Sequence, residues 1–130
     1  MSAFVFDESR WPLLVLRIPE RYTHEEFVDH CNRVRAYFER KERFAMVTDA
    51  RGSYHPNATQ RRLMVSTIEL AGTRALNCVG CAVVVNSGLL AGVLTALQWA
   101  TKLPYPSVNV TSPLEAEEWC RQRLAARSAA

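Results

Sequence analysis

One polar stretch and one later serine gather the residue types that could do chemistry. Asp49, Arg51, Ser53 and His55 alternate along a short loop, and Ser87 lies in a second loop. A carboxylate, an imidazole and a hydroxyl are the components of a hydrolytic triad. A guanidinium is the group that binds carboxylates and phosphates with two parallel hydrogen bonds. The sequence therefore raises two possibilities for these loops, acyl hydrolysis and anion binding.

A catalytic interpretation lacks the sequence context that it requires. Neither Ser53 nor Ser87 lies in a G-x-S-x-G turn, which would expose a serine nucleophile. His24, Glu26 and His30 precede the loops on a predicted helix, without the ligand spacing of a zinc site. We therefore expect no catalytic residue, no bound metal and no cofactor.

A non-catalytic interpretation of the first loop is open in two forms. Free backbone amides at helix N-termini attract anions, which favours a ligand- or partner-binding set that comprises Arg51, Ser53, His55, Arg61 and Ser87. The second form, which we favour, gives these residues structural roles only: Asp49 anchors the loop by accepting backbone N–H bonds. His55, Arg61 and Arg62 are then solvated side chains.

The four cysteines have the pattern of buried thiols. Cys78 and Cys81 are separated by two residues, as in a metal knuckle, but no second pair with histidines accompanies them. They belong to an apolar run, in which we expect positions three apart to face opposite sides of a sheet. Cys31 and Cys120 lie on predicted helices. We expect four reduced thiols in a reducing compartment, the cytoplasm.

Small residues recur every four positions in a later helix. Gly88, Gly92 and Ala96 form a smooth strip, and Trp99 and Tyr105 follow it. The favoured interpretation is close packing of this helix on the sheet, because glycine permits close approach. The alternative is a homodimer surface of Gly88, Gly92, Ala96 and Trp99, with an aromatic anchor.

These side chains are positioned by alternating strands and helices. Apolar runs of strand length lie at residues 3–7, 12–18, 44–49, 79–85 and 108–110. Thr23-x-x-Glu26 and Asn57-x-x-Gln60 predict capping boxes for helices to about Arg43 and Leu76. Asn86 or Ser87 caps a third helix to about Lys102, and Ser112 with Pro113 begins a fourth.

The order β-β-α-β-α-β-α-β-α predicts a single α/β domain. A hairpin at residues 8–10 joins the first two strands, and alternation after it requires parallel pairing. We expect a mixed, mostly parallel, five-stranded sheet with four helices over residues 1–124, and a frayed tail at 125–130. Ligands of such sheets bind beyond the carboxyl ends of the strands, where both polar loops meet.

Composition narrows the partners. The chain of 130 residues is 48% hydrophobic and 22% charged, with a formal net charge of +3. This small positive charge does not indicate nucleic-acid binding, for which we would expect a concentrated basic face. The most apolar stretch, residues 88–97, is too short to span a bilayer. We expect a soluble cytoplasmic protein that binds no nucleic acid and has no membrane span.

The succession of elements resembles the STAS family, the fold of anti-sigma-factor antagonists, together with the related CRAL-TRIO class. The resemblance rests on element order over nearly the whole chain and on Asp49 after the third strand. It implies a regulatory or protein-interaction module. The family's phosphorylated serine follows this aspartate directly, but here the position is Ala50, so the resemblance implies no phosphosite.

Two functions follow for testing. The first is a non-catalytic regulatory or protein-interaction module that binds another protein or itself. The alternative is a domain that binds a small anionic or lipid-like ligand at the loop after the third strand, with weak hydrolytic activity as an extension.

Overall fold

One sheet of five strands runs through the molecule in the order of the sequence. The computed structural model describes residues 4–51, 57–72, 77–89, 91–92, 95, 103 and 105–126, with the backbone alone at 61, 68 and 70–72. The strands are β1 (Val5–Arg10), β2 (Leu13–Arg17), β3 (Phe44–Asp49), β4 (Cys78–Val84) and β5 (Ser107–Val110). β1 pairs with β2 antiparallel, and the other three neighbouring pairs are parallel. The expected mixed α/β sheet is confirmed.

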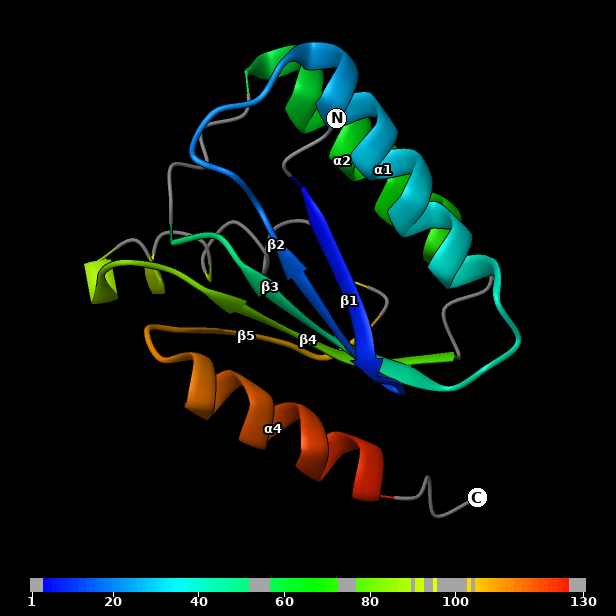
Figure 1. Cartoon of the computed structure of the whole chain (residues 1–130), viewed down its shortest axis with the longest axis vertical. Coiled ribbons are helices and arrows are strands. Elements are labelled where there is room, and N and C mark those ends of the chain that lie inside the picture. Colours follow the sequence, from blue (N-terminus) through cyan, green and yellow to red (C-terminus); the bar gives the residue numbers. More distant parts are fainter. Residues whose placement is uncertain are drawn as a thin grey trace.

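Helices cover both faces of the sheet (Figure 1). α1 (His24–Glu39) and α2 (Ala58–Gly72) lie side by side over one face, and α4 (Pro113–Ala125) packs under β3 and β4 on the other. These three helices are the ones that the structure describes. The expected helix between β4 and β5 lies mostly outside the described residues, although those described at 88–89, 91–92 and 95 are helical.

Local capping signals fix where the helices begin. The Thr23 hydroxyl accepts from the Glu26 amide at 3.1 Å, and the Glu26 carboxylate accepts from the Thr23 amide at 3.0 Å. Asn57 and Gln60 form the same reciprocal pair at the start of α2. These bonds satisfy amides that have no partner within the helix. Both predicted capping boxes are confirmed.

The core consists of layers on the two sides of the sheet. Toward α1 and α2, bulky side chains dominate, among them Leu14, Leu16, Phe38, Phe44 and Met46. Toward α4, the side chains are smaller, among them Leu13, Val15, Ala45, Val47, Ala82 and Val84. β2 and β3 are buried on both faces, which explains their continuous apolar runs.

The hairpin turn lies later than we expected. Residues 8–10 continue β1, and the turn consists of Trp11 and Pro12, which are joined by a cis peptide bond. The polar residues at 8–10 indicated a turn, but they belong to an edge strand where each can reach a polar partner. Glu8 binds Arg40, and Arg10 forms an ion pair with Glu117.

Arg43 terminates a different helix from the one we predicted. α1 ends at Glu39, because Arg40 adopts an extended backbone conformation. Arg43, exposed just before β3, donates hydrogen bonds to the carbonyls of residues 123, 124 and 126 at the end of α4. A cation suits this negative end of the helix dipole. We predicted a frayed tail from residue 125, but Ala125 is the last residue of α4 and the Ala126 carbonyl accepts a hydrogen bond from Arg43. The rest of the predicted tail, residues 127–130, lies outside the described residues.

A bulge in β4 changes the facing of its first residues. Phe44 is opposite Cys78 but Ala45 is opposite Gly80, so Val79 is an extra residue. The Val79 side chain and the Cβ position of Gly80 therefore both face α4. Cys78 and Cys81 consequently share the face toward α1, and the expectation that they face opposite sides is wrong.

Candidate functional site

The carboxyl ends of β2, β3 and β4 meet at one edge, as the fold requires. Arg17 and Asp49 are opposite each other at the ends of β2 and β3. The Ile18 amide donates to the Asp49 carbonyl at 3.0 Å, and the Ala50 amide donates to the Val84 carbonyl at 2.9 Å. The backbone of this edge is thus held by ladder bonds, which gives its side chains fixed origins.

Asp49 anchors the loop and also holds Arg51. The Arg51 guanidinium donates from Nε and Nη2 to the two carboxylate oxygens at 3.0 and 2.8 Å, and the Arg51 amide donates to Oδ1 at 3.2 Å. These bonds from Arg51 lower the pKa of Asp49. The Asx-turn anchor that we predicted is present in this structure, with a bidentate ion pair added to it.

Two adjoining hollows lie around this ion pair, and we call them together the strand-end groove. The larger has a volume of about 360 Å³ and is lined by Arg17, Ile18, Asp49, Arg51 and Asn86. The smaller, about 100 Å³, extends under the sheet to α4 and is lined by Arg10, Val15, Arg17, Val47, Asp49, Arg51, Pro113 and Glu117. The Asn86 side chain closes one wall by donating to the Arg51 carbonyl.

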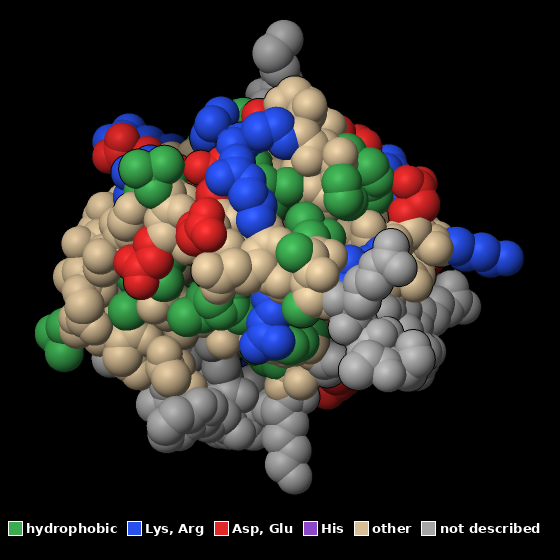
Figure 2. Space-filling view, turned by 90° about the horizontal axis from the view of Figure 1, so that it is seen from below, with side chains coloured by type: hydrophobic (Ala, Val, Ile, Leu, Met, Phe, Trp, Pro, Cys, Tyr) green, Lys and Arg blue, Asp and Glu red, His purple; other side chains and the backbone are tan. Residues whose placement is uncertain are grey.

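The charges of the groove are paired except at one position. Arg51 pairs with Asp49, and Arg10 pairs with Glu117. Arg17 is exposed and forms no ion pair with a described residue, although its charge contributes to lowering the pKa of Asp49. Seen from the side of α4, Lys and Arg side chains form a band beside acidic ones (Figure 2). Among the described residues, Arg17 is therefore the one guanidinium of the groove without an ion-pair partner, although it lies near enough to Asp7 and Asp49 to lower the pKa of both.

The predicted binding residues are partly brought together here. Arg51 lines the groove, and Ser87, the neighbour of Asn86, is exposed beside it. Ser53, His55 and the side chain of Arg61 lie outside the described residues. Sequence reasoning missed Arg10, Arg17 and Glu117. For Arg17 a signal existed, because it follows Val15 by two positions and must share its face at the end of a strand.

The glycine strip is not packed on the sheet where the structure describes it. Gly88 and Gly92 are exposed, and a Cβ atom built on either would meet no atom within 4 Å. The favoured expectation of close packing is wrong for these two residues. Ala96 and Trp99 lie outside the described residues, and the homodimer surface stays a prediction.

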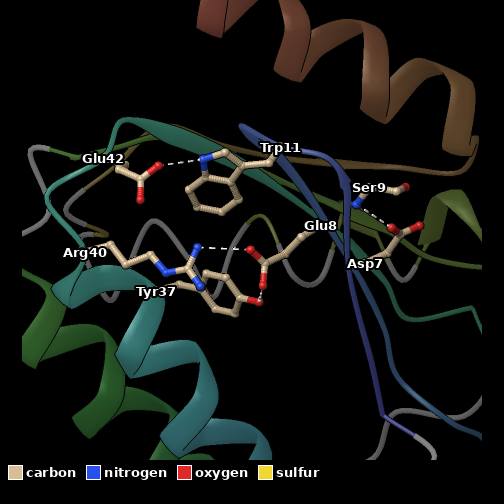
Figure 3. Close-up of polar contacts among 7 residues, drawn as sticks. All are labelled: Asp7, Glu8, Ser9, Trp11, Tyr37, Arg40 and Glu42. Carbon is tan, nitrogen blue, oxygen red and sulfur yellow. Dashed lines mark hydrogen bonds and ion pairs between the residues drawn. The ribbon is translucent and has the colours of Figure 1, made fainter.

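A second polar cluster fastens the hairpin to α1 at the opposite end of the sheet (Figure 3). Glu8 accepts from the Tyr37 hydroxyl at 2.6 Å and from the Arg40 guanidinium at 3.0 Å, and the Trp11 indole donates to Glu42 at 3.0 Å. Burial and the bond to Glu8 raise the pKa of Tyr37 to about 12. Arg40 stacks over Trp11 and Tyr37. The members of this cluster satisfy one another, which indicates a structural role.

All four cysteines are free and buried. Burial raises the pKa of Cys81 to about 11 and that of Cys120 to about 12. The Cys120 thiol donates to the Met46 carbonyl at 3.3 Å. Such thiols stay protonated at neutral pH and behave as small core residues. In the part of the chain that the structure describes, no three His, Cys, Asp or Glu side chains converge as a metal site would require.

Comparisons with protein-family models, with curated proteins and with solved structures found no match to this chain. Among the described residues, no helix has the length and apolarity needed to cross a bilayer.

Proposed function

We propose that this chain is a non-catalytic protein-interaction module of STAS-like type, and that its partner binds at the strand-end groove. The observation that supports this proposal most is the character of the groove. It is open, charged, and lined by side chains from β1, β2, β3, α4 and the segment after β4. Small-molecule sites are typically concave and mostly apolar, with a few convergent polar groups. An open charged surface fits a protein contact better.

The electrostatics of the groove also disfavour acid–base chemistry at Asp49. A general base works best when its pKa lies near the operating pH. The hydrogen bonds from Arg51 instead lower the pKa of Asp49, so its carboxylate is a weak base at neutral pH. Glu117 is likewise occupied by Arg10. These pairs support binding and loop positioning over catalysis.

Regulation by phosphate at the position that the resemblance gives finds no support. Ala50 carries no hydroxyl, is 8% exposed, and its amide is bonded to the Val84 carbonyl. A module that binds its partner without phosphorylation at this position agrees with both observations.

The test is recovery of a partner that depends on the groove. The tagged full chain, its Arg17→Ala and Arg51→Ala variants, and an Arg121→Ala control on the exposed side of α4 are purified from the cells that encode the chain after cross-linking. We expect one protein to co-purify with the unmodified chain and with Arg121→Ala, and to be depleted at least fivefold with Arg17→Ala. Equal recovery with all four proteins, or no recurrent partner, would contradict the proposal.

The alternative, a small-anion site, is favoured by the guanidinium of Arg17, which forms no ion pair with any residue that the structure describes. It predicts saturable chemical-shift changes confined to the groove when phosphate or citrate is titrated into the ¹⁵N-labelled chain. The interaction module predicts only the weak, unsaturated changes of ionic screening.

A further inference from the structure

We infer that the strand-end groove binds a peptide segment in which an acidic side chain is flanked on both sides by large aliphatic residues. This inference rests on the proposed function and names the chemistry of the partner. It is carried by three side chains, Arg17, Leu89 and Leu114.

The two most exposed large hydrophobic side chains of the described chain lie close in sequence to wall residues of the two hollows. Leu89 is 83% exposed and Leu114 is 77% exposed, whereas Val5 and Val65 are near 40%. Leu89 follows Asn86, a wall of the larger hollow, by three residues. Leu114 follows Pro113, a wall of the smaller hollow, directly. In Figure 1 the segment after β4 and the start of α4 lie at the same end of the molecule.

Exposed leucines of this kind differ from ordinary surface apolar atoms. Single apolar residues on a surface need no explanation, but these two follow walls of the same groove at its two hollows and are exposed about twice as much as Val5 and Val65. Each leucine is the second residue of a helical segment at the carboxyl edge of the sheet. The backbone bonds from Ala91 to Ser87 and from Ala116 to Ser112 close the helical turns that contain them. A partner that covers them removes apolar surface from water, which stabilises the complex.

Arg17 supplies the charge that the partner must complement. It lines both hollows and lies between two closed ion pairs, Arg51 with Asp49 and Arg10 with Glu117. A carboxylate that enters between them finds Arg17 without a competing ion pair from any described residue. A basic side chain would meet the same two ion pairs and, in addition, the positive charge of Arg17. Charge complementarity therefore selects an acidic centre, and the leucines select aliphatic flanks.

The experiment selects peptides from a random 16-residue display library on the immobilised full chain. We expect the enriched peptides to carry Asp or Glu with Leu, Ile, Val, Met or Phe on both sides. Enrichment of basic peptides, of peptides without this pattern, or of none would overturn the inference.

Variants then assign the contacts of one enriched peptide by fluorescence polarisation. We expect Arg17→Ala, Leu89→Ser and Leu114→Ser each to weaken binding about tenfold, while Arg17→Lys loses less and the controls Arg121→Ala and Val65→Ser lose less than twofold. Changing the acidic residue of the peptide to its amide should weaken binding to the unmodified chain but add nothing to Arg17→Ala. Thermal melts confirm that each variant is folded.

Other occupants give separable results. Displacement of the peptide by 10 mM phosphate at constant ionic strength, with the leucine variants unchanged, would show a free-anion site and overturn the inference. Competition by unlabelled chain at the affinity of self-association would show a second copy as the occupant and overturn it too. If the peptide experiments contradict the inference while an Arg17-dependent partner still co-purifies, the proposed function stands without the inference. If no such partner co-purifies, both the inference and the proposed function are contradicted.

Discussion

Gly80 lies where a side chain would collide with Trp119, and this contact can be measured. A Cβ atom at position 80 would be 2.7 and 2.8 Å from two ring carbons of Trp119. Carbon atoms normally approach to about 3.5–4.0 Å, so Gly80→Ala must displace the ring. The guanidinium carbon of Arg123 lies over the Trp119 ring, 5.1 Å from its centre, and the ring packs against the core between α4 and the sheet. The displacement therefore disturbs α4 as well as β4.

The magnitude follows from two opposing effects. Overpacking of this kind costs about 1–3 kcal/mol. Replacement of glycine by alanine also restricts the unfolded chain, which offsets about 0.4–1 kcal/mol. We expect Gly80→Ala to lower the free energy of unfolding by about 1–2 kcal/mol, measured by urea denaturation.

A double-mutant cycle isolates the collision from other effects. Trp119→Leu removes the ring atoms that a Cβ would meet, so Gly80→Ala in that background should be neutral or slightly stabilising. The coupling energy should then equal the overpacking cost, about 1–3 kcal/mol. Gly88→Ala is the matched control, since its Cβ meets no atom within 4 Å. The same loss from Gly80→Ala with and without Trp119 would refute this account of the bulge.

Three further predictions concern the ends and the interior of the fold. Arg43→Ala should lower the free energy of unfolding by about 1 kcal/mol, since solvent takes over its exposed bonds to the last turn of α4, and Arg43→Lys should recover part of this in urea melts. His30 is buried against aromatic rings, and burial is the main reason why its pKa falls to about 4. The unfolded chain therefore binds the proton at a higher pH than the folded chain does. The free energy of unfolding should be highest above pH 6.5 and decline by up to about 3 kcal/mol toward pH 4. Urea midpoints between pH 7.5 and 4.5 test this, and a His30→Leu variant should lose this component. The four buried cysteines should react with a thiol reagent only at the rate of unfolding; rapid labelling of the native chain would contradict their placement.

Local signals in the sequence were enough for the framework of the fold. The two residues of each capping box, Thr23 with Glu26 and Asn57 with Gln60, are three positions apart. Their bonds could therefore be predicted without knowing the tertiary structure. β3 was likewise predicted at its observed bounds, because its apolar run begins directly after Arg43 and ends at the polar pair Thr48 and Asp49.

Features that depend on distant partners could not be predicted. The bulge of β4 matches Gly80 to Trp119, about forty residues later in the chain, and no local pattern signals it. Arg43 caps a helix that begins seventy residues away. The strand-end groove depends on the same kind of contact, since the pairing of Arg10 with Glu117 leaves Arg17 without an ion-pair partner among the described residues.

The sequential order of the strands has a consequence for synthesis. Each new strand pairs with the one made just before it, so the sheet can grow as the chain leaves the ribosome, with α1 and α2 already covering one face. The opposite face depends on α4, which comes last in the order of described elements. Until residues 113–125 have emerged, Val15, Ala45 and Val47 lack the helix that completes their core. A nascent chain halted before Pro113 therefore exposes an apolar sheet face, the kind of surface that chaperones bind and that aggregates when left bare.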